Sequence, residues 1–334
     1  MPLSRALNTP RTILVTGGAG FIGSHLVEHL LGRGDRVVVV DDLSTGRLSN
    51  LDVARERAGD RLGIHEGTVS EVLPELDPQA FDGIHHLAAA VGVRLVVEEP
   101  VRTIETNVHE TSAVLAFARR ASVPTLVAST SEVYGKGLRT PFAEDDDVVY
   151  GPTTVPRWSY ACSKAIDEYL ALAHDREGLV PTVVVRFFNT VGPRQSGEHG
   201  MVLPRFVQAA LDGEPIEVHG DGRQSRCFCD VRDAVPVLPR LLEDPTNHGR
   251  VFNLGRDELI EIGELATKVR DRVGSTSEIS FIPYEDAFDD RFEDLRVRQP
   301  DLSRIRSAVG FDPTIPLERT IDDLANVVRT EVRS

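Results

Sequence analysis

Short apolar runs alternate with longer amphipathic segments through the first half of the chain. The apolar runs predict strands at residues 12–16, 36–41, 83–87, 125–129 and 182–187. Segments with the helical period lie among them, at about 22–33, 101–121 and 159–177. Alternating strands and helices predict a parallel sheet covered by helices on both faces, which is the doubly wound α/β fold.

The pattern becomes irregular after about residue 189. Glycine and proline interrupt shorter segments there, and helices are predicted around 201–212, 233–243 and 261–273. We therefore predict an α/β domain over 11–188 and a smaller C-terminal lobe, mainly over 189–330. The pattern leaves open whether segments of this lobe return to the first domain.

Charge excludes some partners. The 334 residues include 37 Lys and Arg against 52 Asp and Glu, which gives a net charge of −15. Nucleic acid and anionic membrane surfaces would repel such a chain, so neither is expected as a partner. An anionic substrate would require a few arginines placed locally around it.

Neither a membrane span nor a secretory signal is predicted. No apolar run is long enough to span a bilayer, and residues 1–11 lack the apolar core of a signal peptide. The three cysteines, Cys162, Cys227 and Cys229, match neither a disulfide framework nor a zinc spacing. We expect a cytoplasmic protein without a metal site.

A glycine turn follows the first predicted strand. Gly17, Gly20 and Gly23 lie between the strand 12–16 and a predicted helix. This order is typical of a dinucleotide-binding Rossmann domain, in which the turn brings the helix N-terminus to the pyrophosphate. Asp41 ends the next strand, where a carboxylate bonds the ribose hydroxyls and repels a 2′-phosphate, which favours NAD over NADP. Arg47 lies close enough in sequence to weaken that preference.

Candidate reacting groups follow the fourth predicted strand, at residues 125–129. Tyr160 and Lys164 are four residues apart, which places them on one face of a helix. A cation lowers the pKa of a neighbouring phenol, so Tyr160 is expected to take a proton from a hydroxyl that Thr130 also bonds. His85 and His86 end a buried strand without a third ligand in view, so we interpret them as core residues rather than metal ligands.

Several of these motifs together resemble a known family. The glycine turn, the strand that ends in His86-Leu-Ala-Ala89, the stretch Ser129–Gly135, the Tyr160/Lys164 pair and the segment Arg186–Arg194 are similar to the extended short-chain dehydrogenase/reductases that act as nucleotide-sugar epimerases and dehydratases. The resemblance covers about residues 11–330. It implies a Rossmann domain, a smaller substrate-binding lobe, bound NAD and transient oxidation of a sugar at C4.

The resemblance also implies which residues contact NAD. They are Gly17, Gly20, Phe21, Ile22, Gly23, Asp41, Ser44, Thr45, Gly46, Thr68, Val69, Leu87, Ala88, Ala89, Ser129, Tyr160 and Lys164. Thr68 departs from the family, which usually has an aspartate facing the adenine, so the hydrogen bond expected there is weaker.

Within the family, the chain is most similar to the UDP-glucuronate decarboxylases. It carries Thr130-Ser131-Glu132 where the dehydratases have Asp-Glu after the threonine, and Arg298 matches the arginine that faces the sugar carboxylate. The implied catalytic residues are Thr130, Ser131, Glu132, Tyr160, Lys164 and Arg298. They predict decarboxylation of UDP-glucuronate, through a UDP-4-keto-hexuronate, to a UDP-4-keto-pentose and/or UDP-xylose.

Two alternatives stay open. Arg94 ends a segment that looks like an epimerase loop, so the chain could be a UDP-sugar 4-epimerase, acting on UDP-glucuronate or on UDP-glucose and UDP-galactose. It could also be a non-catalytic NAD-binding protein, since fold does not determine function.

The resemblance further implies substrate contacts and an assembly. The residues expected at the UDP-sugar are Arg94, Arg186, Asn189, Val202, Leu203, His219, Arg226 and Arg291. Apolar stripes run along the predicted helices 101–121 and 159–177. They could simply cover the sheet, but the family resemblance suggests a homodimer in which the two helices pair across a two-fold axis.

Overall fold

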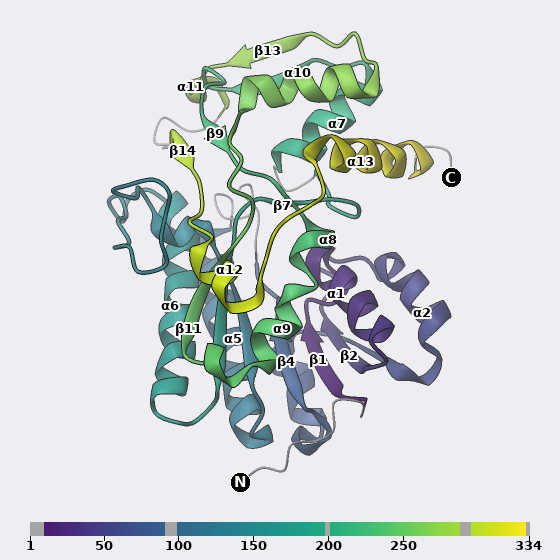
Figure 1. The fold of residues 1–334 in the computed structure, drawn as a ribbon, viewed down its shortest axis with the longest axis vertical. Helices are drawn as coiled ribbons and strands as arrows, with labels where there is room; N and C mark the ends of the chain where they lie inside the picture. The colour runs from purple at the N-terminus through teal and green to yellow at the C-terminus, as the bar shows by residue number, and fades with distance from the viewer. Residues whose placement is uncertain (1–9, 91–98, 198–200, 288–294, 332–334) are drawn as a thin grey trace.

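A parallel β-sheet lies at the centre of the fold (Figure 1). The computed structural model describes residues 10–90, 99–197, 201–287 and 295–331. In that part of the chain the sheet has seven strands, in the order β11 (Arg250–Leu254), β6 (Thr182–Phe187), β5 (Thr125–Thr130), β4 (Gly83–His86), β1 (Thr12–Thr16), β2 (Arg36–Asp41) and β3 (Leu62–Glu66). All neighbouring pairs are parallel. The predicted fold class is therefore confirmed.

Helices bury both faces of this sheet, which explains the continuous apolar runs in its inner strands β1, β2 and β6. Adjacent residues of β1 point to opposite faces. Leu14 packs in a cluster with α3 (Val69–Val72) and α5 (Pro100–Ala121). Val15 packs in a cluster with α1 (Phe21–Gly32), α9 (Val237–Glu243) and α12 (Ser303–Val309). α6 (Arg157–Arg176) lies beside α5 and packs on β5 and β6.

The five predicted strands are all present, with β4 ending at His86 and β5 continuing to Thr130. Two strands of the sheet were not predicted. β3 is an edge strand that ends in the exposed residues His65 and Glu66, so its apolar pattern is weak. The apolar pattern of β11 is interrupted by the buried Asn253. Its side chain is satisfied there, because it accepts from the Tyr134 hydroxyl at 2.6 Å and donates to a backbone carbonyl.

A second lobe lies beyond the carboxyl ends of the strands, at the top of Figure 1. α7 (Val202–Asp212), α10 (Ile262–Val273) and α13 (Leu317–Glu331) pack around the paired strands β8 (Ile216–His219) and β13 (Ile279–Ile282). β11, α9 and α12 also follow residue 189 in sequence, yet they pack with the first domain. The division at residue 189 stays a prediction.

Short elements complete the described chain. They are the strands β7 (Thr190–Val191), β10 (Cys229–Asp230), β9 (Ser225–Arg226), β12 (Ile260–Glu261) and β14 (Val297–Arg298), the helices α2 (Asp52–Ala58), α8 (Val231–Ala234) and α11 (Tyr284–Ala287), and the 3₁₀ turns η1 (Leu48–Leu51), η2 (Gly59–Arg61), η3 (Leu73–Glu75), η4 (Pro78–Ala80), η5 (Ser131–Tyr134) and η6 (Pro245–Asn247). β9 pairs with both β12 and β14. In the residues that the structure describes, no helix is long and apolar enough to cross a membrane.

Candidate active site

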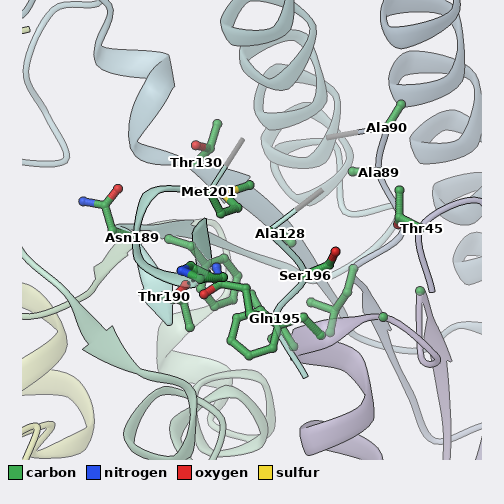
Figure 2. Close-up of a pocket in the computed structure, with 18 of the residues that line it drawn as sticks. Thr45, Ala89, Ala90, Ala128, Thr130, Asn189, Thr190, Gln195, Ser196 and Met201 are labelled. Carbon is green, nitrogen blue, oxygen red and sulfur yellow. Dashed lines mark hydrogen bonds between the residues drawn. The ribbon is translucent and has the colours of Figure 1, made fainter. Parts of the chain in front are cut away.

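A cavity of about 1630 Å³ lies at the carboxyl ends of the strands, where ligands bind in doubly wound sheets. Its lining comes from both lobes, because it includes Gly17 and Asp41 of the first and Arg226 of the second. In the view of Figure 2 it extends from Asn189 on the left to Thr45 on the right.

The glycine turn presents backbone rather than side chains to this cavity. Gly17 has a φ of +69°, and a Cβ on Gly23 would lie 2.0 Å from the Gly17 carbonyl oxygen, so the turn requires glycine at both positions. Gly20 caps α1 without a side-chain hydrogen bond. Phe21 and Ile22 begin the helix and line the cavity. The N-terminal backbone N–H groups of α1 therefore form a positively polarised site that suits a pyrophosphate.

Asp41 lies beside this turn at the end of β2. Its carboxylate accepts hydrogen bonds from the backbone N–H groups of Ala19 and Leu43, both at 2.9 Å. Burial raises the pKa of Asp41, and these hydrogen bonds oppose the rise. A Cβ on Gly46 would lie 2.8 Å from Asp41 Oδ1, so Gly46 leaves room for the carboxylate. Gly46 is not among the residues that line the cavity, unlike its neighbour Thr45.

The remaining residues expected at the cofactor lie along the same cavity wall. They are Ser44, Thr68, Val69, Leu87, Ala88, Ala89 and Ser129. Thr68 caps α3, and its hydroxyl donates to Glu71 Oε2 at 2.8 Å. The Thr68 hydroxyl, which was expected to face the adenine, thus donates its hydrogen bond to another side chain of the protein. Arg47 also lines the cavity, so the sequence argument that it weakens the preference for NAD stays open.

Tyr160 and Lys164 project from α6 into the cavity, and Thr130 faces them from the end of β5. Thr130 hydrogen-bonds Tyr160. Lys164 Nζ donates to Asp167 Oδ2 at 2.6 Å. Burial raises the pKa of Tyr160, and the negative charges of Glu132 and Asp167 add to the rise. In the chain alone the pKa of Tyr160 is therefore raised rather than lowered, chiefly because the phenol is buried.

Glu132 and Arg298 form an ion pair in the same cavity. Arg298 Nη1 lies 2.6 Å from Glu132 Oε1, and Arg157 Nη2 lies 3.5 Å from Glu132 Oε2. Thr130 helps to place Glu132 by accepting its backbone N–H at 3.2 Å. Ser131 is buried and lines the same cavity. Arg157 was missed in the sequence, although it precedes Tyr160 by three residues and so shares a helix face with it.

Four of the expected substrate residues line the cavity, namely Asn189, Val202, His219 and Arg226. His219 accepts from Arg205 Nη1 at 2.8 Å, and burial and this cation lower the pKa of His219. Arg205 also lines the cavity and was missed in the sequence. Arg94 and Arg291 lie outside the described residues.

Two expected substrate residues do not point at the cavity. Arg186 is buried, forms two hydrogen bonds with Glu168 at 2.9 and 2.7 Å, and lies over the Tyr134 ring at 4.6 Å. Glu168 in turn accepts from Ser129 Oγ at 2.5 Å. Leu203 is fully buried in the core of the second lobe. We assign no substrate contact to either side chain, because Arg186 is hydrogen-bonded to Glu168 and Leu203 packs in a hydrophobic core.

Comparison with known proteins agrees with the geometry of this site. A sequence model of the NAD dependent epimerase/dehydratase family matches residues 13–255. The chain is 37% identical over 318 residues to the UDP-N-acetyl-alpha-D-glucosaminuronate decarboxylase of Bacillus cytotoxicus, a match that covers 93% of this chain and 95% of that protein. It is 36% identical over 326 residues to UDP-glucuronic acid decarboxylase 1 of Arabidopsis thaliana, which covers 96% of this chain and 71% of that protein.

A solved structure extends the comparison to the whole fold. The UDP-glucose 4-epimerase of Thermotoga maritima, determined with UDP-glucose, superposes with a TM-score of 0.85 and 26% sequence identity, and covers 96% of this chain and 99% of that one. The family model and both relatives extend over most of the chain, as the sequence motifs predicted. The chain therefore belongs to the NAD dependent epimerase/dehydratase family.

Proposed function

We propose that this chain is an NAD-dependent decarboxylase of a UDP-activated uronate, with UDP-glucuronate as substrate. The observation that carries the proposal is the Glu132–Arg298 pair at 2.6 Å, beside Tyr160 and Thr130 in one cavity. An epimerase needs a base for the C4 hydroxyl, but it needs no proton donor for C5. A cation suits the carboxylate of a uronate in either reaction, so the acidic group next to that cation is what decarboxylation adds.

The residues fit NAD. The glycine turn leaves space for a pyrophosphate against the N-terminus of α1, and Asp41 is held at the end of β2, where the ribose hydroxyls would lie. When bound, NAD would accept a hydride from C4 of the sugar and, for UDP-xylose as product, return it. Lys164 and Ser129 line the same cavity as Tyr160.

Tyr160 would remove the proton from the C4 hydroxyl, which Thr130 helps to orient. The phenol begins with a raised pKa, so a nearby positive charge is needed to make it an effective base. Oxidation at C4 places a ketone β to the carboxylate, and a β-keto acid loses CO2 readily. The protein then has to hold the departing carboxylate and protonate C5.

Arg298 and Glu132 suit these two tasks. Arg298 is almost completely buried, with a side chain 8% exposed, so its charge is poorly screened and attracts a carboxylate strongly. The substrate carboxylate would share Arg298 with Glu132, while Arg157 provides Glu132 with a second cation. The proton that C5 receives would come from water, and Glu132, a carboxylate beside two arginines, would relay it.

Mass spectrometry of the incubated nucleotide sugar tests the proposal. We expect UDP-glucuronate to give a product lighter by one CO2, and Tyr160→Phe, as the control, to give none. UDP-N-acetylglucosaminuronate should be incubated in parallel, because the Bacillus cytotoxicus relative is named for that substrate. An isomer of unchanged mass would instead identify a 4-epimerase, and unchanged sugars with added NAD would identify a non-catalytic protein.

We also propose a homodimer that pairs α5 and α6 across a two-fold axis. Val101 and Ile104 of α5 are 66% and 39% exposed, and Ile166 and Tyr169 of α6 are 43% and 69% exposed. Other apolar residues of the predicted stripes, such as Leu115, are buried within the chain. Light scattering at micromolar concentration should give the dimer mass. Ile166→Glu should reduce the measured mass to that of the monomer, and a monomeric wild-type protein would contradict the proposal.

A cytoplasmic location remains a prediction.

A further inference from the structure

A buried carboxylate lies directly against the lysine of the proposed acid–base group. Asp167 is completely buried and Lys164 is 2% exposed, and their charged atoms are 2.6 Å apart. Asp167 follows Lys164 by three residues, so both lie on the face of α6 that packs inward. Neither the mechanism above nor the cofactor site requires a carboxylate at this position.

A chain of hydrogen bonds runs through β1, β4 and α5 and reaches Asp167 from Thr111 of α5. Thr16 of β1 bonds His86 of β4 at 2.7 Å, and His86 bonds Thr111 of α5 at 3.1 Å. Thr111 in turn bonds the Asp167 carboxylate. Burial and the Lys164 charge lower the pKa of His86 to about 3, so this histidine is neutral and does not compete with Lys164 for Asp167.

We propose that Asp167 is a positioning residue that holds the Lys164 ammonium and offsets its charge, so that the acidity of Tyr160 is set by the pair and not by Lys164 alone. The proposal rests on the proposed function, since it assumes that Tyr160 is the base. A buried ion pair acts at a distance as a dipole, and the field of Lys164 at Tyr160 is weaker than that of an isolated cation. Lys164 still donates hydrogen bonds from a fixed position.

Two other carboxylates near Tyr160 are each paired with arginines. Glu132 of η5 raises the pKa of Tyr160, and its charge is shared with Arg298 of β14 and with Arg157. Glu168, which follows Asp167 on α6, is paired with Arg186 of β6. Among these three carboxylates of the described chain, Asp167 is the one that is paired with Lys164 and not with an arginine. Removal of its charge should therefore change the pKa of Tyr160 measurably.

The size of the effect follows from the helix geometry. Asp167 lies seven residues from Tyr160, a distance of about 10 Å along the helix. At an effective dielectric constant of about 20, one charge at that distance changes a pKa by about one unit. Removal of a negative charge favours the phenolate, so the pKa of Tyr160 should fall by about that amount in Asp167→Asn.

Titration of the phenol at position 160, which requires no catalytic turnover, tests this expected fall in pKa. Difluorotyrosine, whose phenol is more acidic than tyrosine, is incorporated at position 160, and its ionisation is followed by fluorine NMR. We expect Asp167→Asn and Asp167→Ser to lower the midpoint by about one pH unit, and Asp167→Glu, which keeps the charge, to leave it close to that of the unsubstituted protein. Two neutral variants are used so that misfolding of one does not end the test.

Asp175→Asn is the matched control. It removes the same charge from the same helix, but roughly 22 Å from Tyr160, which is beyond the distance at which salt screens charges. An unchanged midpoint in both neutral variants, or an equal shift in Asp175→Asn, would overturn the proposal. Because the titration involves no sugar, its failure is distinct from a failure to release CO2. If the decarboxylase is active, the acid limb of its kcat/KM profile should move to lower pH by the same amount in Asp167→Asn.

Discussion

Replacement of Glu132 by glutamine separates the two roles that its carboxylate has in the cavity. Glutamine keeps the size of the side chain and an oxygen that accepts from Arg298, but it cannot deliver a proton. The Glu132 side chain is 25% exposed, but that of Arg298 is only 8% exposed, so Glu132→Gln leaves a buried cation with a neutral acceptor in place of its counter-charge. We expect this to lower the free energy of unfolding by about 1–3 kcal/mol.

The effect on the rate should be much larger. Loss of general acid catalysis slows a reaction by about 10²–10⁴, which raises the barrier by about 3–5 kcal/mol. We therefore expect Glu132→Gln to melt at a moderately lower temperature, to bind UDP normally and to release CO2 at least about a hundredfold more slowly. A native domain is typically stable by about 5–15 kcal/mol, so the variant stays folded in the assay and unfolding cannot imitate the kinetic result.

The assay is the rate of CO2 loss from UDP-glucuronate, followed by mass spectrometry, with UDP binding measured by calorimetry. Glu258→Gln is the matched control, because Glu258 pairs with Arg256 at 2.9 Å on an exposed surface away from the cavity. It should leave the rate unchanged. The reasoning would be refuted by a Glu132→Gln protein that decarboxylates at the wild-type rate.

Three further changes have defined outcomes. Arg298→Ala should lower kcat/KM for the uronate by about 10–100-fold, since a charge-assisted contact is lost, and a smaller change would argue against a carboxylate at this position; steady-state kinetics measures it. Gly23→Ala should lower the melting temperature and abolish NAD retention, because its Cβ would lie 2.0 Å from a backbone oxygen, whereas Gly32→Ala at the end of the same helix meets nothing and should be neutral or slightly stabilising. Burial lowers the pKa of His85 to about 3, so the unfolded chain binds a proton that the folded protein does not as the pH falls below about 6.5. The free energy of unfolding therefore falls as the pH is lowered, by about 2 kcal/mol at pH 5. In urea unfolding, the free energy of unfolding of His85→Leu should decrease less from pH 7 to pH 5 than that of the wild type, by a corresponding amount.

Much of the fold could be predicted because its signals are local. A strand buried on both faces appears as a continuous apolar run, and β1, β2 and β6 have the predicted bounds for that reason. The glycine turn is also a local feature, since strand, turn and helix follow within a dozen residues. β11 lacks such a signal, because it follows residue 189 and contains a buried asparagine whose partners are remote in sequence.

Side-chain direction explains why two of the expected substrate residues do not line the cavity. Arg186 lies near the end of the central strand β6, but its guanidinium is hydrogen-bonded to Glu168. Leu203 lies next to the cavity-lining Val202, yet it points into the core of the second lobe because adjacent residues of a helix face different directions. Spacing along the chain does not determine which of two neighbours faces a ligand.

The sequence by itself determined the alternation of elements, the glycine turn, the acid at the end of β2 and the helical spacing of Tyr160 and Lys164, because each depends on residues that are close along the chain. The tertiary structure alone decided which charges meet. β14 pairs with β9 and so brings Arg298 within 2.6 Å of Glu132, and the packing of α6 against α5, β5 and β6 buries Asp167 against Lys164. Electrostatic interactions depend on distance in space and on burial, and both are set only when the whole chain has folded.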